Sequence, residues 1–186
     1  MASDPGLMHE VYRDVERLRL KLWSGILVNE EEVDWAAARA FGLPTSRAEI
    51  KDGVICVVLN DYLPRVKTVK GEEVRLHWIR MVVDAINRLG SVPVFERAFC
   101  VIVPYLPAGG WDADNVAYKY ILDGVRYAVL DGDTYDKLSF AVIGAVDKER
   151  PRTEVYIVEA PEGMYQDLPK KLKTFIGQGA GAISAI

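Results

Sequence analysis

The stretch GVICVVL, residues 53–59, decides the fold class of this chain. Its unbroken run of apolar and β-branched residues is typical of a buried strand. The run ERAFCVIVPYLP, residues 96–107, indicates a second strand that is closed by prolines. Two further runs, LSFAVIGAV at 138–146 and TEVYIVEA at 153–160, predict an antiparallel pair of strands across the turn DKERPR.

Segments with apolar residues at helical spacing separate and precede these strands. Residues 72–89 and residues 115–129 each carry one apolar face, and residues 6–27 and 31–41 indicate two helices ahead of the first strand. The order strand, helix, strand, helix, strand, strand predicts an α+β fold. We expect a small mixed β-sheet with helices packed on it, preceded by an N-terminal helical extension.

The composition suits a packed domain with extensions, since half of the 186 residues are hydrophobic. We place the extension at 1–48, the main domain at 50–160 and a tail at 161–186. The formal net charge of −4 argues against a uniformly basic surface but permits a local basic patch. The sequence shows neither a secretory signal nor the ~20 consecutive apolar residues of a membrane span. We therefore expect a soluble, cytoplasmic protein with no membrane partner.

The cysteines and histidines narrow the possible chemistry. Cys56 and Cys100 lie in apolar runs, which predicts two buried, reduced thiols. His9 and His77 are the only histidines and lie far apart in the chain, which argues against a histidine-rich zinc site and a serine or cysteine triad. Any catalysis would therefore depend on carboxylates.

The stretch GGWDADNVAYKYILDG, residues 109–124, places Asp112 and Asp114 at the approach to a predicted helix. One interpretation is helix capping, in which Asp114 is the N-cap and Asp112 lies near the positive helix end. A second is a calcium loop that includes Asp123 in twelfth place, although the required central glycine is missing. A third is a Mg²⁺ site for phosphodiester chemistry, because carboxylate oxygens suit this ion.

The third interpretation draws on further residues downstream. Lys119 could offset developing negative charge, and Asp131 and Asp133 form a second acidic cluster. In this third interpretation, the carboxylates available to Mg²⁺ are those of Asp112, Asp114, Asp133 and Asp131.

This pattern resembles the RusA-type Holliday junction resolvases. The D-x-D-N motif, the following lysine, the aspartate four residues after it and the later acidic pair resemble the family over about residues 50–160. The resemblance implies that Asp112, Asp114 and Asp133 are metal-binding catalytic aspartates and that Lys119 is the catalytic lysine. Two features depart from the family: Lys119 follows Asp114 by five residues rather than four, and the acidic pair is split as Asp131-Gly132-Asp133.

The resemblance implies a Mg²⁺-dependent endonuclease that resolves four-way DNA junctions in recombination and repair. Arg65, Lys67 and Lys70 lie in a polar loop after the first strand, and we expect them to contact DNA phosphates. One alternative is a catalytically impaired nucleic-acid-binding relative, and another is a structural domain whose aspartates only cap a helix.

The predicted helix also leads to an expected oligomeric state. Residues 115–129 would span about 22 Å as an unbroken helix, which separates the two acidic clusters. A single Mg²⁺ ion needs all its ligands within roughly 2.1 Å. We therefore expect a homodimer in which Asp112 and Asp114 face Asp133 of the partner subunit, giving active sites shared between subunits.

Overall fold

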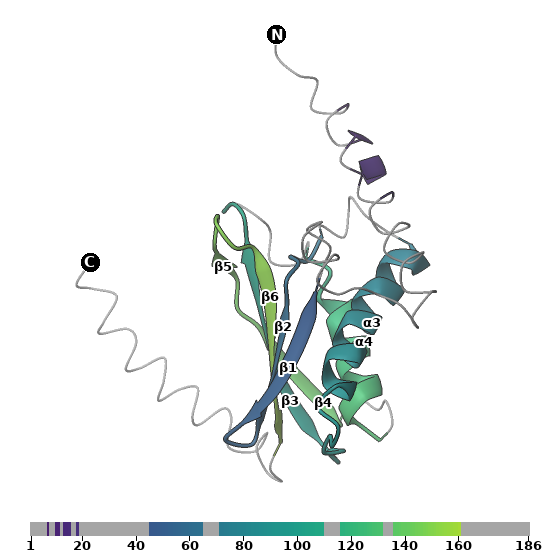
Figure 1. Cartoon of the computed structure of the whole chain (residues 1–186), viewed down its shortest axis with the longest axis vertical. Helices are drawn as coiled ribbons and strands as arrows, with labels where there is room; N and C mark the ends of the chain where they lie inside the picture. The colour runs from purple at the N-terminus through teal and green to yellow at the C-terminus, as the bar shows by residue number, and fades with distance from the viewer. Residues whose placement is uncertain are drawn as a thin grey trace, which may run out of the picture.

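The computed structural model describes residues 45–64, 71–109, 116–131 and 136–160, together with separate helical positions between 7 and 18. These residues form the predicted α+β fold, a six-stranded mixed sheet with two helices, α3 and α4, side by side on one face (Figure 1). The elements are β1 Ser46–Lys51, β2 Val54–Leu59, α3 Glu72–Asn87, β3 Ala98–Leu106, α4 Tyr118–Val129, β4 Leu138–Val142, β5 Ala145–Val146 and β6 Arg152–Glu159.

The strand order is β1-β2-β6-β3-β4, with β5 also pairing with β3. The last strand, β6, therefore lies between β2 and β3 and is antiparallel to both. The predicted antiparallel pairing of 138–146 with 153–160 is wrong, because β4 pairs in parallel with the other side of β3. The physical reason is the crossover through α4, which returns the chain to the start of β3 and so makes β4 parallel to it.

The first strand has no counterpart among the strands predicted from the sequence. It forms a hairpin with β2 through a two-residue turn, in which Asp52 and Gly53 both have positive φ (51° and 78°). Two positive φ values are characteristic of the type I′ turn, whose twist matches that of the flanking strands. This turn fixes the register from Lys51↔Val54 to Ser46↔Leu59.

The core lies between the sheet and the two helices. On α3, Trp78, Val82 and Ile86 are fully buried, and on α4 Ile121 and Val125 are fully buried. They pack in one cluster with inward-facing strand residues, among them Ile55, Val57, Leu59, Cys100, Ile102, Val155 and Ile157. The helical faces predicted from the apolar spacing are thus the buried ones.

The two helices approach each other closely at Gly124. A Cβ atom added there would lie 2.8 Å from the Cβ of Val82 and 3.2 Å from the backbone oxygen of Ile79. Such distances are shorter than ordinary van der Waals contact, so only glycine fits this helix crossing without displacement of α3.

The other face of the sheet is not covered by a helix of the described residues (Figure 1). Its side chains alternate with the buried ones and are mostly half-buried, as in β2 and β3. Within the described part of the chain, no helix is long and apolar enough to cross a membrane. The predicted helix 31–41 and the predicted tail 161–186 lie outside the described residues.

Candidate functional site

Most residues predicted to bind metal or DNA lie outside the described part of the chain. These are Asp112, Asp114 and Asp133, and the loop residues Arg65, Lys67 and Lys70. The assignment of Mg²⁺ to these carboxylates therefore stays a prediction.

The two remaining predicted site residues, Lys119 and Asp131, are described and lie apart. Lys119 is exposed at the beginning of α4, and Asp131 is exposed just after its end. The helix begins at Tyr118, later than predicted, so its 12 residues span about 18 Å. The Nζ of Lys137 donates a hydrogen bond to the backbone oxygen of Asp131.

The helix start also decides the capping interpretation. The N-cap residue of α4 is Ala117, and no side chain caps the helix. The prediction that Asp114 is the N-cap is therefore wrong.

Asp123, the aspartate four residues after Lys119, forms an ion pair. Its Oδ2 lies 3.1 Å from the Nε of Arg75 on α3, and Arg75 Nη1 lies 2.9 Å from Glu72. Among the described residues, no group of three or more His, Cys, Asp or Glu side chains is placed to hold a metal ion.

The open face of the sheet carries a groove of about 620 Å³. It crosses β1, β2 and β6 where β2 ends and β6 begins, and the turn before β6 forms one of its walls. Strand register places Arg47, Val58 and Glu154 in one row across these three strands. The complete lining is Arg47, Val58, Asn60, Glu149, Arg150, Pro151, Arg152 and Glu154.

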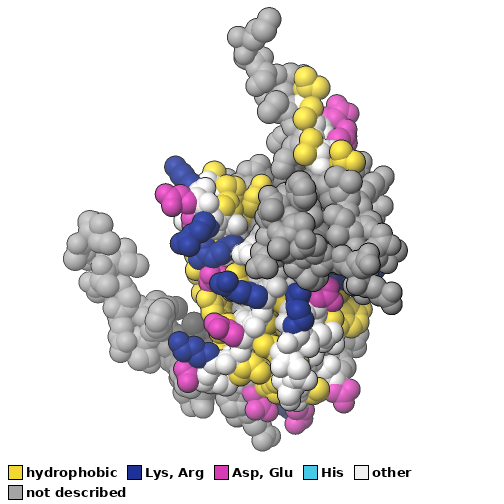
Figure 2. Space-filling model, viewed as in Figure 1, with side chains coloured by type: hydrophobic (Ala, Val, Ile, Leu, Met, Phe, Trp, Pro, Cys, Tyr) yellow, Lys and Arg dark blue, Asp and Glu magenta, His cyan; other side chains and the backbone are white. Residues whose placement is uncertain are grey.

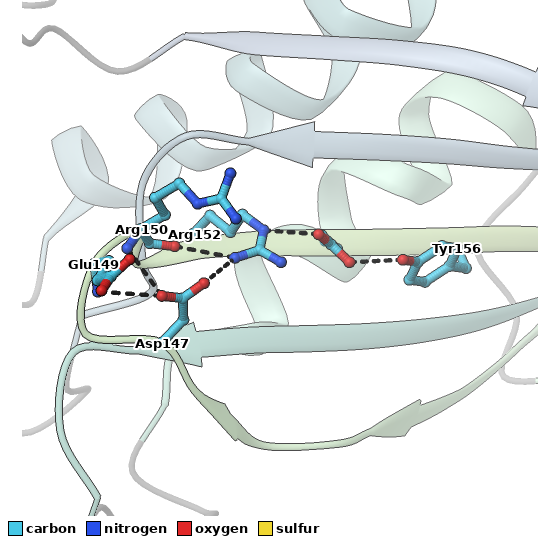
Figure 3. A network of polar contacts seen from close by, with 6 residues as sticks. Asp147, Glu149, Arg150, Arg152 and Tyr156 are labelled. Carbon is cyan, nitrogen blue, oxygen red and sulfur yellow. Dashed lines mark hydrogen bonds and ion pairs between the residues drawn. The ribbon is translucent and has the colours of Figure 1, made fainter.

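Arg152 is held in place on the groove floor by several contacts (Figure 3). Its Nη1 lies 2.7 Å from Asp147 Oδ2 and its Nε lies 2.7 Å from Glu154 Oε1. Nη1 also donates to the backbone oxygen of Arg150, and the guanidinium stacks 3.7 Å from the ring centroid of Tyr105. The guanidinium group of Arg152 is therefore held in one position.

The two carboxylates bound to Arg152 use both of their oxygens within this network. Asp147 Oδ1 accepts from the backbone N–H groups of Glu149 and Arg150, at 3.1 and 3.0 Å. Glu154 Oε2 accepts from the hydroxyl of Tyr156 at 2.6 Å. The hydrogen bond from the Arg150 backbone, followed by that from Arg152, lowers the pKa of Asp147.

The hydrogen bond between Glu154 and Tyr156 shifts the pKa of the two groups in opposite directions. Burial opposes ionisation of Glu154, but the hydrogen bonds from Tyr156 and Arg152 outweigh it and lower the pKa of Glu154. The hydrogen bond to Glu154 raises the pKa of Tyr156 to about 12. Asp147 and Glu154 are therefore ionised at neutral pH, and with the single positive charge of Arg152 they leave the network with a net charge of −1.

Arg47 and Arg150 differ from Arg152. Both are exposed, and within the described ranges neither guanidinium forms an ion pair or side-chain hydrogen bond. Figure 3 shows the Arg150 side chain extended away from the Asp147 carboxylate, with only its backbone in the network. Figure 2 shows several Lys and Arg side chains on this face of the molecule, with Asp, Glu and hydrophobic side chains between them.

The sequence carries only a partial signal for this groove. The turn DKERPR carries Arg150 and Arg152 on either side of Pro151, so two arginines in a strand-entry turn could have marked it. Arg47 comes from a strand about a hundred residues earlier, and only the placement of β6 beside β2 brings it to the groove.

No protein-family model matches this sequence. No curated protein matches it either. A search of solved structures finds the periplasmic domain of Helicobacter pylori MotB, with 13% identity over 68% of this chain and 89% of that chain, and a TM-score of 0.38. It also finds the OmpA-like domain of FopA1 from Francisella tularensis, with 12% identity over 62% of this chain and 81% of that chain, and a TM-score of 0.30. These similarities are low, and no ligand or partner is inferred from them.

These comparisons contradict the predicted resemblance to RusA-type resolvases. No family model and no curated protein, of resolvases or of any other family, matches the sequence. The predictions that depended on the resemblance are wrong with it: the junction-resolving endonuclease, the impaired nucleic-acid-binding relative and the branched-DNA partner. The homodimer with shared active sites, which was expected from the helix between the two acidic clusters, falls with the nuclease site that it was to complete. The physical reason is that two aspartates before a helix form too short a pattern to specify one fold, because acidic residues are favoured near the positive end of any helix.

Proposed function

We propose that this domain binds an anionic group, a carboxylate or a phosphate, in the groove over β1, β2 and β6. The observation that carries the proposal is the pair of guanidinium groups on Arg47 and Arg150, which have no carboxylate partner among the described residues and line the same groove as the fixed Arg152. The predicted cytoplasmic location stays a prediction.

The chemistry of the lining favours an anion over a cation. The formal charges around the groove balance, since Arg47, Arg150 and Arg152 stand against Asp147, Glu149 and Glu154. The oxygens of Asp147 and Glu154 already accept hydrogen bonds, whereas among the described residues the guanidinium groups of Arg47 and Arg150 keep their donors for a ligand. Planar guanidinium groups match the oxygens of carboxylates and phosphates with two parallel hydrogen bonds. Asn60 adds a fixed amide, because its Nδ2 donates to Thr45 Oγ1 at 2.7 Å.

Calorimetry with inorganic phosphate and with citrate tests this proposal, and the uncharged glycerol serves as the blank. We expect Arg47→Ala and Arg150→Ala each to weaken binding by about tenfold, the effect of removing one hydrogen bond to a charged group. Because both arginines are exposed, binding should also weaken as salt rises.

Arg80→Ala is the matched control, since Arg80 is an exposed arginine on α3, away from the groove lining. It should leave the affinity unchanged. Absence of binding by either anion, or an equal loss in the Arg80 variant, would contradict the proposal.

A further inference from the structure

Strand β1 forms one edge of the sheet, and within the described residues only β2 pairs with it. Residues of an antiparallel pair alternate between directing their backbone groups to the partner strand and directing them away from it. Since Lys51↔Val54 closes a two-residue turn, Lys51, Glu49 and Arg47 direct theirs to β2. Ala48 and Ile50 therefore direct their N–H and C=O groups to the outer side of the sheet.

Two contacts agree with this alternation. The backbone N–H of Asn60 donates to the oxygen of Thr45 at 2.8 Å, which continues the inward set. From the outside, Arg88 Nη2 donates to the backbone oxygen of Ser46 at 3.2 Å. Arg88 thus occupies the outward acceptor at the beginning of β1, and the outward groups of Ala48 and Ile50 lie beyond it.

The side chains of β1 on the open face carry alternating charge. Arg47, Glu49 and Lys51 lie there, and their neighbours on β2 are the uncharged Val58, Cys56 and Val54. Within the described part of the chain, none of these three charges forms an ion pair. On the opposite face of the strand, Ile50 is 47% exposed.

The charge pattern indicates which kind of strand fits this edge. A second copy of β1, antiparallel and centred on Glu49, would place Arg47 opposite Lys51 and Glu49 opposite Glu49. A copy centred on Ala48 or on Ile50 would pair Glu49 with Arg47 or with Lys51, but would leave the third charge without an opposite charge. A parallel copy in register would place like charges opposite each other. Directly opposed like charges destabilise a strand pair, and opposite charges stabilise it. The complement of β1 is a strand with acidic, basic and acidic residues at alternate positions.

We propose that the β1 edge binds an extended peptide segment of a partner protein with this acidic–basic–acidic alternation. The segment adds a strand to the sheet through the outward backbone groups of Ala48 and Ile50, and its apolar residues cover Ile50. The inference goes beyond anion binding in the groove and shares only Arg47 with it.

Two blocked peptides, TEVKVET and TKVEVKT, are the probes, and fluorescence anisotropy measures their binding to the full chain. We expect TEVKVET to bind about tenfold more tightly, the combined effect of three opposite-charge pairs. The net charge of −4 on the protein favours the other peptide, so overall charge cannot produce this result. Equal affinities, or no binding of TEVKVET, would overturn the inference.

Backbone pairing is tested without altering the protein. N-methylation of TEVKVET either at both valines or at its charged residues removes one alternate set of amide donors. Methylation of one set should abolish binding and methylation of the other should leave it intact, because only one set of amide groups faces β1. Binding by both methylated peptides would contradict strand addition.

Variants of the protein separate this edge from the groove. Ala48→Pro removes an outward N–H while the bonds to β2 remain, and it should abolish peptide binding without unfolding the domain. Arg150→Ala should weaken phosphate binding and leave peptide binding unchanged. Either proposal can therefore fail while the other holds.

Discussion

Asp147 organises the turn that forms one wall of the groove. Its two oxygens join the backbone N–H groups of Glu149 and Arg150 to the guanidinium of Arg152. The carboxylate therefore shapes the turn and fixes the arginine beneath it. Arg150 owes its position in the groove to this backbone contact rather than to any contact of its own side chain.

The pH dependence of stability should report this role. The hydrogen bonds to Asp147 lower its pKa below the ordinary value of 3.8. Its stabilising contribution is therefore fully present above that value and is lost as the pH falls through the lower, folded-state pKa. We expect Asp147→Asn to reduce the free energy of unfolding at about pH 6 and to cost much less at about pH 2.

Urea unfolding of both proteins at the two pH values measures this difference. Asp14→Asn, at an exposed aspartate of the N-terminal helix, is the control and should show no such convergence. A cost of Asp147→Asn that is independent of pH would show that the charge of Asp147 does not contribute.

The predicted Mg²⁺ ligands permit a test that is independent of any enzymatic activity. If Asp112 and Asp114, which both precede α4, bind one Mg²⁺ ion, their mutual repulsion should be relieved by this cation. We expect MgCl₂ to raise the melting temperature of the protein and Asp112→Asn to remove most of that rise. A rise that is unchanged in this variant would exclude Asp112 as a ligand.

At the level of secondary structure, the crossing of α3 and α4 depends on a residue without a side chain. A Cβ at Gly124 would meet the Cβ of Val82 and the backbone oxygen of Ile79. The backbone of a helix cannot yield as a flexible side chain can. Close contact at Gly124 thus sets how near the two helices lie and how tightly both cover the sheet.

Gly124→Ala should therefore destabilise the domain, although alanine favours a helix by about 1 kcal/mol over glycine. Overpacking in a tight core costs roughly 1–3 kcal/mol, so we expect a net loss of about 1 kcal/mol in the free energy of unfolding. Chemical denaturation measures it. Lys119→Ala, an exposed change on the same helix, should lie within about 0.5 kcal/mol of the wild type.

These elements also show what the sequence could and could not predict. The buried faces of α3 and α4 and strands β2, β3 and β6 followed from apolar spacing, which burial itself imposes. Strand β1, with the sequence SRAEIK, was missed because a charged edge strand lacks that spacing. The neighbours of β6 were mispredicted because proximity in the chain favours a hairpin, whereas the crossover through α4 separates β4 from it.

The groove could not be predicted for a related reason. Its arginines lie on β1 and around the start of β6, and strand order alone brings them together. The acidic motif, by contrast, is contiguous and was easily found, but contiguity did not make its family resemblance correct. Local patterns predicted the elements, and the groove arose from their assembly.

For the domain as a whole, the two cysteines can distinguish reagent access in the folded state from access after unfolding. Cys100 is fully buried, and burial raises the pKa of its thiol to about 12. Cys56 lies half-buried on the open face of the sheet. Because the thiolate is the reactive form, the two should differ in their access to alkylating reagents.

Under native conditions, we expect iodoacetamide to modify Cys56 well before Cys100, and modification of Cys100 to follow the rate of global unfolding. Peptide mass mapping over time distinguishes the two sites. Labelling of Cys100 that is as fast as that of Cys56 would show that the core opens locally, without unfolding of the sheet.

The position of β6 has a consequence for the synthesis of the protein. As the ribosome releases the chain from its N-terminus, the β1–β2 hairpin emerges early, and β3, α4 and β4 follow. No main-chain hydrogen bond joins β2 to β3 at that stage, because β6, which lies between them, is the last of the described strands to be synthesised. The facing edges of β2 and β3 therefore stay unpaired until Arg152–Glu159 leaves the exit tunnel. During that interval a chaperone can still bind the incomplete sheet.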